Sequence, residues 1–110
     1  MNIKNALLPL VLVSTLMHSF PSRAQEDHAI YGFYTDSCGQ WLEARRAGGL
    51  EEIKYSIWVL GFVSGVGFAG YTLKESDRQG MTNWIDNYCE EHPLERFHEA
   101  AEALISAMQK

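Results

Sequence analysis

The sequence predicts an all-α fold: a single small domain of about four helices around a central apolar helix, with one disulfide. Three observations predict it. Apolar residues recur at helical spacing in several segments, and no stretch alternates between apolar and polar residues as a half-buried strand does. The chain also has two cysteines, Cys38 and Cys89, which lie in separate helical segments.

The N-terminal residues have the layout of a secretory signal peptide. Lys4 is followed by an apolar stretch over residues 6–17, and the small residues Ser22 and Ala24 fit a cleavage site. The stretch is shorter than the roughly 20 apolar residues that a bilayer-spanning helix needs. We therefore predict that residues 1–24 are a signal peptide and that residues 25–110 form the domain. An uncleaved anchor is the alternative.

The predicted mature chain is strongly acidic. Lys4 and Arg23 lie in the predicted signal peptide, so residues 25–110 keep 7 of the 9 basic side chains and all 14 acidic ones, a net charge of −7. Nucleic acids and anionic membrane surfaces are bound by clustered lysine and arginine. The charge therefore argues against both classes of partner.

The two cysteines are predicted to form a disulfide. Export would deliver Cys38 and Cys89 to an oxidising compartment, where such bonds persist. Closing a loop of about 50 residues stabilises a domain by about 4 kcal/mol in the chain-entropy model. A reactive thiol is the functional alternative, but the sequence has no C-x-x-C spacing that would favour it.

Apolar spacing and helix-ending residues define three of the expected helices. The first begins after capping residues at 35–37 and ends at Gly48 and Gly49. The third has one apolar face, made of Met81, Trp84, Ile85, Tyr88 and Cys89. The fourth begins at Pro93, which suits the first helical position, and has a longer stripe, made of Leu94, Phe97, Ala101, Leu104, Ile105 and Met108.

The second expected helix, over about residues 50–73, contains the uncharged run IWVLGFVSGVGFAG at 57–70. Its glycines match G-x-G-x-x-G, but a dinucleotide-binding loop needs a preceding strand and a parallel sheet, and neither is predicted. Residues 55–73 also approach the length of a membrane span, although a span would separate the two cysteines and the polar and small residues weaken its insertion. We predict a buried central helix, apolar nearly all round.

Five residues of this run are predicted to lie in the core: Trp58, Gly61, Phe62, Ser64 and Gly65. The three small ones would let a neighbouring helix approach closely. Each glycine costs up to about 1 kcal/mol of helix stability relative to alanine, which burial and the disulfide would offset.

Four motifs give the chain a resemblance to two families. They are S-C-G-x-W at residues 37–41, W-V-x-G-F-x-S-G at 58–65, W-I-D-x-Y-C-x-x-H-P at 84–93 and A-A-x-x-L-I at 100–105. With these motifs the chain resembles the Rap/Tai type VI secretion immunity proteins of Gram-negative bacteria and, more distantly, the acid-stress chaperone HdeA. The first resemblance implies a periplasmic helical protein, often dimeric, that binds and blocks a cell-wall-degrading effector. The second implies one disulfide joining helices on either side of a buried helix, which Cys38 and Cys89 match.

No catalytic, metal or cofactor site is expected, and the chain is predicted not to be an enzyme. Glu95 and His98 form one Glu-x-x-His step, whereas a di-iron bundle needs two such steps and two further glutamates. Ser64 lacks the glycine two residues before it that a nucleophile elbow requires. His98 is expected at the surface or at a helix cap, and His92 at a helix junction.

Two functional classes remain, and both act through protein contacts. As a binding protein, the chain would meet an exported hydrolase effector, or a second copy in a homodimer, near Tyr31, Phe33 and Tyr34, because aromatic residues dominate interface hot spots. As a periplasmic acid-stress chaperone, it would expose apolar surface when acid removes the carboxylate charge. The few lysines of the mature chain favour the binder. A single-span membrane protein using residues 55–73 is the third alternative.

Overall fold

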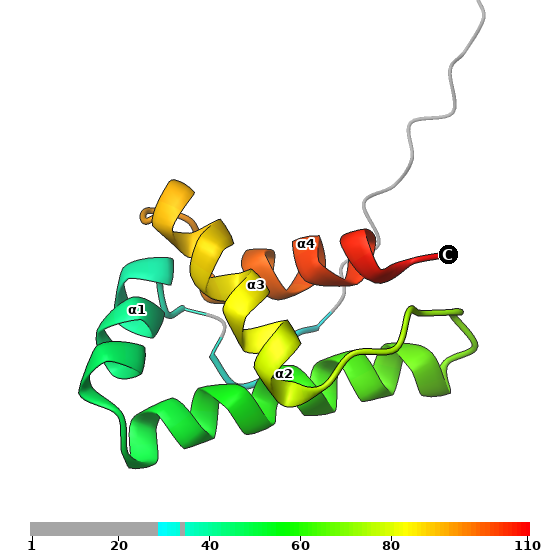
Figure 1. Ribbon diagram of the computed structural model, residues 1–110, viewed down its shortest axis with the longest axis horizontal. Helices are drawn as coiled ribbons and strands as arrows, with labels where there is room; N and C mark the ends of the chain where they lie inside the picture. The colour runs from blue at the N-terminus through cyan, green and yellow to red at the C-terminus, as the bar shows by residue number, and fades with distance from the viewer. Residues whose placement is uncertain (1–28, 34) are drawn as a thin grey trace, which may run out of the picture.

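The computed structural model describes residues 29–33 and 35–110 of the chain (Figure 1). Within these residues the chain forms four helices and no strand: α1 (Cys38–Ala47), α2 (Leu50–Phe68), α3 (Arg78–Glu91) and α4 (Phe97–Met108). The prediction of one all-α domain of about four helices is therefore confirmed. The predicted signal peptide lies outside the described residues.

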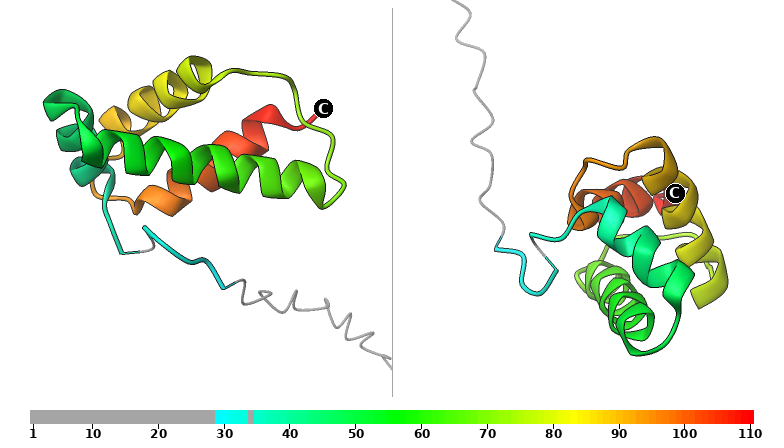
Figure 2. Two further views of the ribbon diagram at one scale, coloured as in Figure 1. Left: turned by 90° about the horizontal axis from the view of Figure 1, so that it is seen from below. Right: turned by 90° about the vertical axis from the view of Figure 1, so that its left-hand side faces the viewer.

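The four helices pack around one shared core. The long helix α2 runs along one side of the domain, α4 lies across from it, α3 crosses both, and α1 stands at the end where α2 begins (Figures 1 and 2). Every helix contacts the other three. The core between them is built on fully buried side chains, among them Trp41, Val59, Ile85 and Phe97.

A capping box and two glycines set the ends of α1, as the sequence predicts. Ser37 Oγ accepts a hydrogen bond from the backbone N–H of Gln40 (3.2 Å), and Gln40 Oε1 accepts one from the backbone N–H of Ser37 (2.8 Å). This reciprocal pair satisfies N–H groups that the first turn leaves without partners. The helix stops before Gly48 and Gly49, whose φ angles of 67° and 81° favour glycine.

The predicted disulfide is confirmed. It joins Cys38, the first residue of α1, to Cys89 near the end of α3, across 51 residues of sequence. Both cysteines are fully buried in the core cluster that includes Trp41 and Phe97, whose rings stack with centroids 5.1 Å apart. The bond therefore fastens α1 to α3 from inside the domain.

Helix α2 is covered on one side, whereas the sequence predicts cover on all sides. It turns Tyr55, Ser56, Val59 and Val63 toward the core. Gly61, Ser64 and Gly65 lie on the opposite side and are exposed, and a Cβ atom on either glycine would meet nothing within 4 Å. The expectation that these three residues admit a neighbouring helix of the domain is therefore wrong.

The two large predicted core residues of α2 do pack inward. Trp58 and Phe62 are half-buried against the core cluster, and their rings stack with centroids 5.2 Å apart. They lie at the border between the covered and the open side of α2. The run at residues 57–70 thus contributes Trp58 and Phe62 to the core, while Gly61, Ser64 and Gly65 lie on the surface.

Helix α4 begins later than the sequence predicts. The chain from Pro93 to Arg96 pairs with the start of α1 instead: Pro93 O accepts from Gly39 N (3.2 Å) and Glu95 O from Cys38 N (2.8 Å). These backbone bonds hold the segment out of a helix. Leu94, expected in the apolar stripe, is consequently 95% exposed.

Helix α2 ends at Phe68, and the chain that follows it is extended. Gly70 turns the chain with φ of 103°, and Lys74 N then donates to Met108 O at 2.7 Å. Residues 55–73 are therefore helical only in part. No helix among residues 29–33 and 35–110 combines the length and the apolar character that a membrane crossing requires.

Candidate protein-binding site

The three predicted partner-binding aromatics differ in their placement. Tyr31 is on the surface, with 81% of the residue exposed. Phe33 is half-buried and stacks on the ring of Tyr55, with centroids 4.1 Å apart. Tyr34 lies outside the described residues. Tyr31 is therefore available to a partner, whereas Phe33 packs against the core of the domain.

The backbone around Tyr31 is held against α2 by Trp58. The Trp58 indole Nε1–H donates to the Tyr31 carbonyl at 2.7 Å. The next residue, Gly32, has φ of 96°, and a Cβ atom there would lie 2.6 Å from Trp58 Nε1. Only glycine fits a position that combines this φ with such close approach. The segment at residues 29–33 is thus seated along the edge of α2.

An apolar groove lies between α2 and α4. Its larger cavity, about 420 Å³ in volume, is lined by Ala29, Ile30, Phe62, Val66, Tyr71, Glu102, Ile105 and Gln109. A second cavity of about 390 Å³ shares Ala29, Ile30 and Phe62 with it and extends along α2 to Tyr31 and Ile57. We refer to the two together as the α2–α4 groove. Each is within the range of about 300–1,000 Å³ that is common for ligand pockets.

The open side of α2 carries a second apolar surface. Leu50, Ile53, Ile57 and Phe68 are exposed there, Phe68 to 96%. Together with Gly61, Ser64 and Gly65 on the same side, we call this surface the α2 stripe. Contiguous exposed apolar residues commonly mark interaction sites. The stripe faces away from the core, and it shares Ile57 and Gly61 with the second cavity of the groove.

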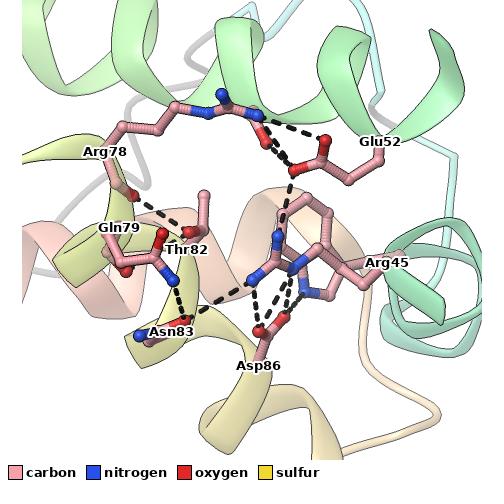
Figure 3. Close-up of polar contacts among 9 residues, drawn as sticks. Arg45, Glu52, Arg78, Gln79, Thr82, Asn83 and Asp86 are labelled. Carbon is pink, nitrogen blue, oxygen red and sulfur yellow. Dashed lines mark hydrogen bonds and ion pairs between the residues drawn. The ribbon is translucent and has the colours of Figure 1, made fainter. Parts of the chain in front are cut away.

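A charged network joins α1, α2 and α3 (Figure 3). Arg45 Nε donates to both carboxylate oxygens of Asp86 (3.0 and 3.1 Å), and its Nη1 donates to Glu52 (3.0 Å). Arg78 Nη2 also donates to Glu52 (3.1 Å), and the Trp41 indole N–H donates to Asp86 (2.8 Å). Two cations and two carboxylates thus balance each other between three helices.

Hydrogen bonds shift the pKa values inside this network. The Ser56 hydroxyl donates to Glu52 at 2.8 Å and, with Arg78 and Arg45, lowers the pKa of that carboxyl against the opposing effect of burial. The hydrogen bond to Asp86 raises the pKa of Arg45. Both shifts favour the charged forms, so the network is stable at neutral pH.

Two tyrosines make structural hydrogen bonds to carboxylates. Tyr88 donates to Glu95 at 2.6 Å, which together with burial raises the pKa of Tyr88 to about 12. Burial, followed by the hydrogen bond to Asp36, raises the pKa of Tyr55. These bonds fasten α3 to the turn before α4 and the segment before α1 to α2. Neither tyrosine is set up as a general acid or base at neutral pH.

Two histidines, His92 and His98, lie in the part of the chain that the structure describes. His98 is buried inside the first turn of α4, contrary to the expectation of a surface or cap position, and the N-cap is Arg96. The Nε2 atom of His98 is 3.9 Å from Glu102 Oε1. His92 lies at the end of α3, at the helix junction predicted for it, where its ring stacks on Tyr88. In the part of the chain that the structure describes, no three His, Cys, Asp or Glu side chains are grouped so that they could hold a metal ion.

Comparisons of the chain with family models, with curated proteins and with solved structures found no match.

Residue patterns alone missed the groove and the stripe. Val66 and Ile105 face the groove from two helices whose relative placement a sequence does not contain. Leu50, Ile53 and Ile57 follow helical spacing, but the core-facing residues of α2 do so too. The sequence therefore shows two apolar faces on one helix without showing which of them remains open.

Proposed function

We propose that this chain is an exported, non-enzymatic protein that binds another protein, and that the α2–α4 groove receives this partner. The observation that carries the proposal is the groove itself, preformed on a disulfide-linked domain and flanked by the exposed Tyr31 and Tyr71. Tyrosine supplies large contact area and a hydrogen-bonding group, and it is enriched at interface hot spots.

The lining of the groove favours a protein over a small polar molecule. Glu102 and Gln109 contribute the polar side chains of the larger cavity, and its other lining residues are apolar or aromatic. Small-molecule sites usually orient their ligand with several convergent polar groups. An apolar groove with tyrosines at its edges instead suits the side chains of a protein surface.

The more specific proposal is an immunity protein that blocks a cell-wall-degrading effector in the periplasm. It is supported by the motifs at residues 37–41, 58–65 and 84–93, in which the chain resembles Rap/Tai proteins, and by the signal peptide that the sequence predicts. The net charge of −7 predicted for residues 25–110 would steer a partner with a basic surface toward the domain.

The test is inhibition of purified cell-wall hydrolases at neutral pH. Each enzyme of a panel of exported amidases, muramidases and peptidases is assayed on peptidoglycan with and without the purified protein. We expect stoichiometric inhibition of one enzyme with a basic surface. Tyr71→Ala should weaken its binding at least tenfold, because truncation of an aromatic hot-spot residue costs about 2 kcal/mol or more.

Leu94→Ala is the matched control for this experiment. Leu94 is 95% exposed but lies in the turn before α4, outside the groove lining. Its removal should leave the inhibition unchanged. Equal effects of Tyr71→Ala and Leu94→Ala, or no inhibited enzyme in a panel that includes the effectors of the same bacterium, would contradict the proposal.

An acid-stress chaperone is the second candidate, and the charged network favours it. Protonation of Glu52 in acid would remove the counter-charge that Arg45 and Arg78 share between three helices. The test is light scattering of an aggregating client at about pH 2.5, well below the pKa of roughly 4 of free carboxyl groups. Strong suppression of client aggregation in acid, without suppression at neutral pH, would favour the chaperone over the neutral-pH binding protein.

A further inference from the structure

The segment before α1 divides the α2–α4 groove into its two cavities. Ala29 and Ile30 line both cavities, and so does Phe62 of α2, so these three residues form a partition between them. We propose that the partition selects a partner helix with two separate apolar side chains, one for each cavity. This inference rests on the proposed function, because it describes how the partner of that same groove is recognised.

Trp58 holds both parts of the partition in place. Its indole Nε1–H donates to the Tyr31 carbonyl at 2.7 Å, next to Ile30 in the chain. Its ring stacks on Phe62 with centroids 5.2 Å apart and planes inclined by 9°. Among the described residues, the bond from Trp58 is the one hydrogen bond that joins residues 29–33 to a helix. The position of the partition therefore depends on this contact with α2.

Gly32 fixes the segment without lining either cavity. Its φ of 96° favours glycine, and a Cβ atom there would lie 2.6 Å from Trp58 Nε1. The residue after it, Phe33, is half-buried and stacks on the Tyr55 ring with centroids 4.1 Å apart. A segment held in this way is a fixed wall of the groove, around which a partner must fit.

The two cavities lie at a spacing that one helix matches. Ile57 and Gly61 line only the second cavity and Val66 only the larger one, so the cavity centres are about seven residues, or about 10 Å, apart along α2. Side chains at positions i and i+7 of a helix lie on one face and are also about 10 Å apart. Helices commonly enter apolar grooves with anchors at such positions.

The larger cavity adds a charge to this pattern. Among the described residues, Glu102 is the one charged side chain that lines either cavity, and it is 51% exposed. Its Oε1 is 3.9 Å from His98 Nε2, beyond hydrogen-bond distance, so the carboxylate has room to accept from a partner. We therefore expect a lysine or arginine beside the partner side chain that enters the larger cavity.

The test compares Gly32→Ala with the unsubstituted protein in binding to the hydrolase that the protein inhibits. Both proteins are purified with the disulfide intact after expression of the full chain. Gly32→Ala should weaken binding by about tenfold or more, because a released partition no longer provides two preformed cavities. Glu102→Gln should also weaken binding, and more at low salt than at high salt, because it removes a charge from the contact.

Gly49→Ala is the matched control. Gly49 has φ of 81°, a Cβ atom there meets nothing within 4 Å, and the residue lines neither cavity of the groove. The variant has the same kind of backbone strain without touching the partition, so it should leave the affinity unchanged. Equal weakening by the two variants would overturn the inference, and so would a Gly32→Ala variant that binds as tightly as the unsubstituted protein or more tightly. Either result would leave the proposed function standing.

A titration with toluene tests the partition without any hydrolase. Toluene is the analogue of a phenylalanine side chain, and the methyl NMR shifts of Ile57 and Ile105 report on the second and the larger cavity. In the unsubstituted protein the two shifts should saturate at different toluene concentrations, because separate sites have separate affinities. In Gly32→Ala they should follow one curve, because one continuous space remains.

The toluene titration also separates the two possible failures. A single curve in the unsubstituted protein, no response at either methyl group, or two distinct curves in Gly32→Ala would overturn the inference. If no hydrolase is inhibited but toluene still shows two sites that merge in Gly32→Ala, the partition is supported and the proposed function is contradicted.

Discussion

Asp86 links α3 to α1 through two side chains in the network of Figure 3. It accepts hydrogen bonds from Arg45 and Trp41 of α1 while it belongs to α3. We predict that Asp86→Asn lowers the free energy of unfolding by about 1–3 kcal/mol, because the amide retains an acceptor oxygen but leaves the half-buried guanidinium without its nearest counter-charge. Urea denaturation at neutral pH measures the change.

The exposed pair Glu51–Lys54 provides the control for that measurement. Its two side chains are 62% and 50% exposed, against 23% for Asp86 and 24% for Arg45. Exposed ion pairs contribute at most about 1 kcal/mol. Glu51→Gln should therefore shift the urea midpoint less than Asp86→Asn, and a larger shift would show that the network contributes little.

Gly32 controls how the segment at residues 29–33 is seated on α2. We predict that Gly32→Ala releases it, because alanine at φ of 96° costs about 1–2 kcal/mol and its Cβ would collide with Trp58. Hydrogen exchange of the Trp58 indole N–H, followed by NMR, should become about tenfold faster or more. Gly67→Ala, at a negative φ angle with no neighbour within 4 Å, should leave this exchange unchanged.

At the scale of single residues, sequence patterns identified the residues whose roles depend on their immediate neighbours in the chain. Ser37 and Gly48 end α1 as predicted, because caps depend on neighbouring backbone. The burial of His98 was not predicted, because it depends on which helices cover the start of α4. A histidine beside an apolar stripe has the same sequence neighbours whether other helices bury it or leave it exposed to solvent.

The disulfide between α1 and α3 is predicted to supply a large part of the stability. Replacing both cysteines by serine, Cys38→Ser with Cys89→Ser, should lower the free energy of unfolding by about 4 kcal/mol, as the chain-entropy model gives for a loop of about 50 residues. The measurement is urea unfolding of the oxidised protein and of the variant. The oxidised protein should show no titratable thiol until it is denatured and reduced.

A loss of unfolding free energy much smaller than about 4 kcal/mol would mean that the unfolded, reduced chain already keeps the two cysteine-bearing segments together. The single variants separate this case from simple cavity effects. Each leaves one buried thiol and should be about as unstable as the double variant if loop closure is the cause. A large difference between Cys38→Ser and Cys89→Ser would point to packing.

Sequence spacing predicted the existence of the helices better than their placement. The apolar faces of α3 and α4 are one-sided, so their core residues could be predicted. Helix α2 is apolar on both sides, so the sequence has no asymmetry from which its covered face could be inferred. The start of α4 was misplaced because Pro93 suits a first helical position, while tertiary backbone bonds to α1 hold it in a turn.

For the whole molecule, the network predicts a loss of stability in acid. The pKa of Glu52 is lowered in the folded state, so its contribution is full above the unfolded pKa of about 4.3 and is lost as the pH falls through the lower folded value. Glu52→Gln should therefore flatten the decline of unfolding free energy below about pH 5. Urea midpoints across this pH range measure it.

Ser56→Ala tests the cause of that pH dependence. The Ser56 hydroxyl makes the largest contribution to the lowered pKa of Glu52, and the variant removes this hydrogen bond while keeping the carboxylate. The acid decline should flatten in the same direction but less than in Glu52→Gln. An unchanged acid profile in both variants would assign the decline to other carboxylates of this acidic chain.

The bond between Cys38 and Cys89 also makes a covalent ring of everything between them, which includes α2 and the exposed linker that follows it. The linker at residues 69–77 is the stretch of this ring most accessible to a protease, since only Leu73 in it is half-buried. One cut there opens the ring but releases no fragment: α1 and α2 on one side of the cut stay attached to α3 and α4 on the other through sulfur. A nicked molecule would thus migrate as two pieces only after reduction, and it would keep its core in a compartment where proteases are present.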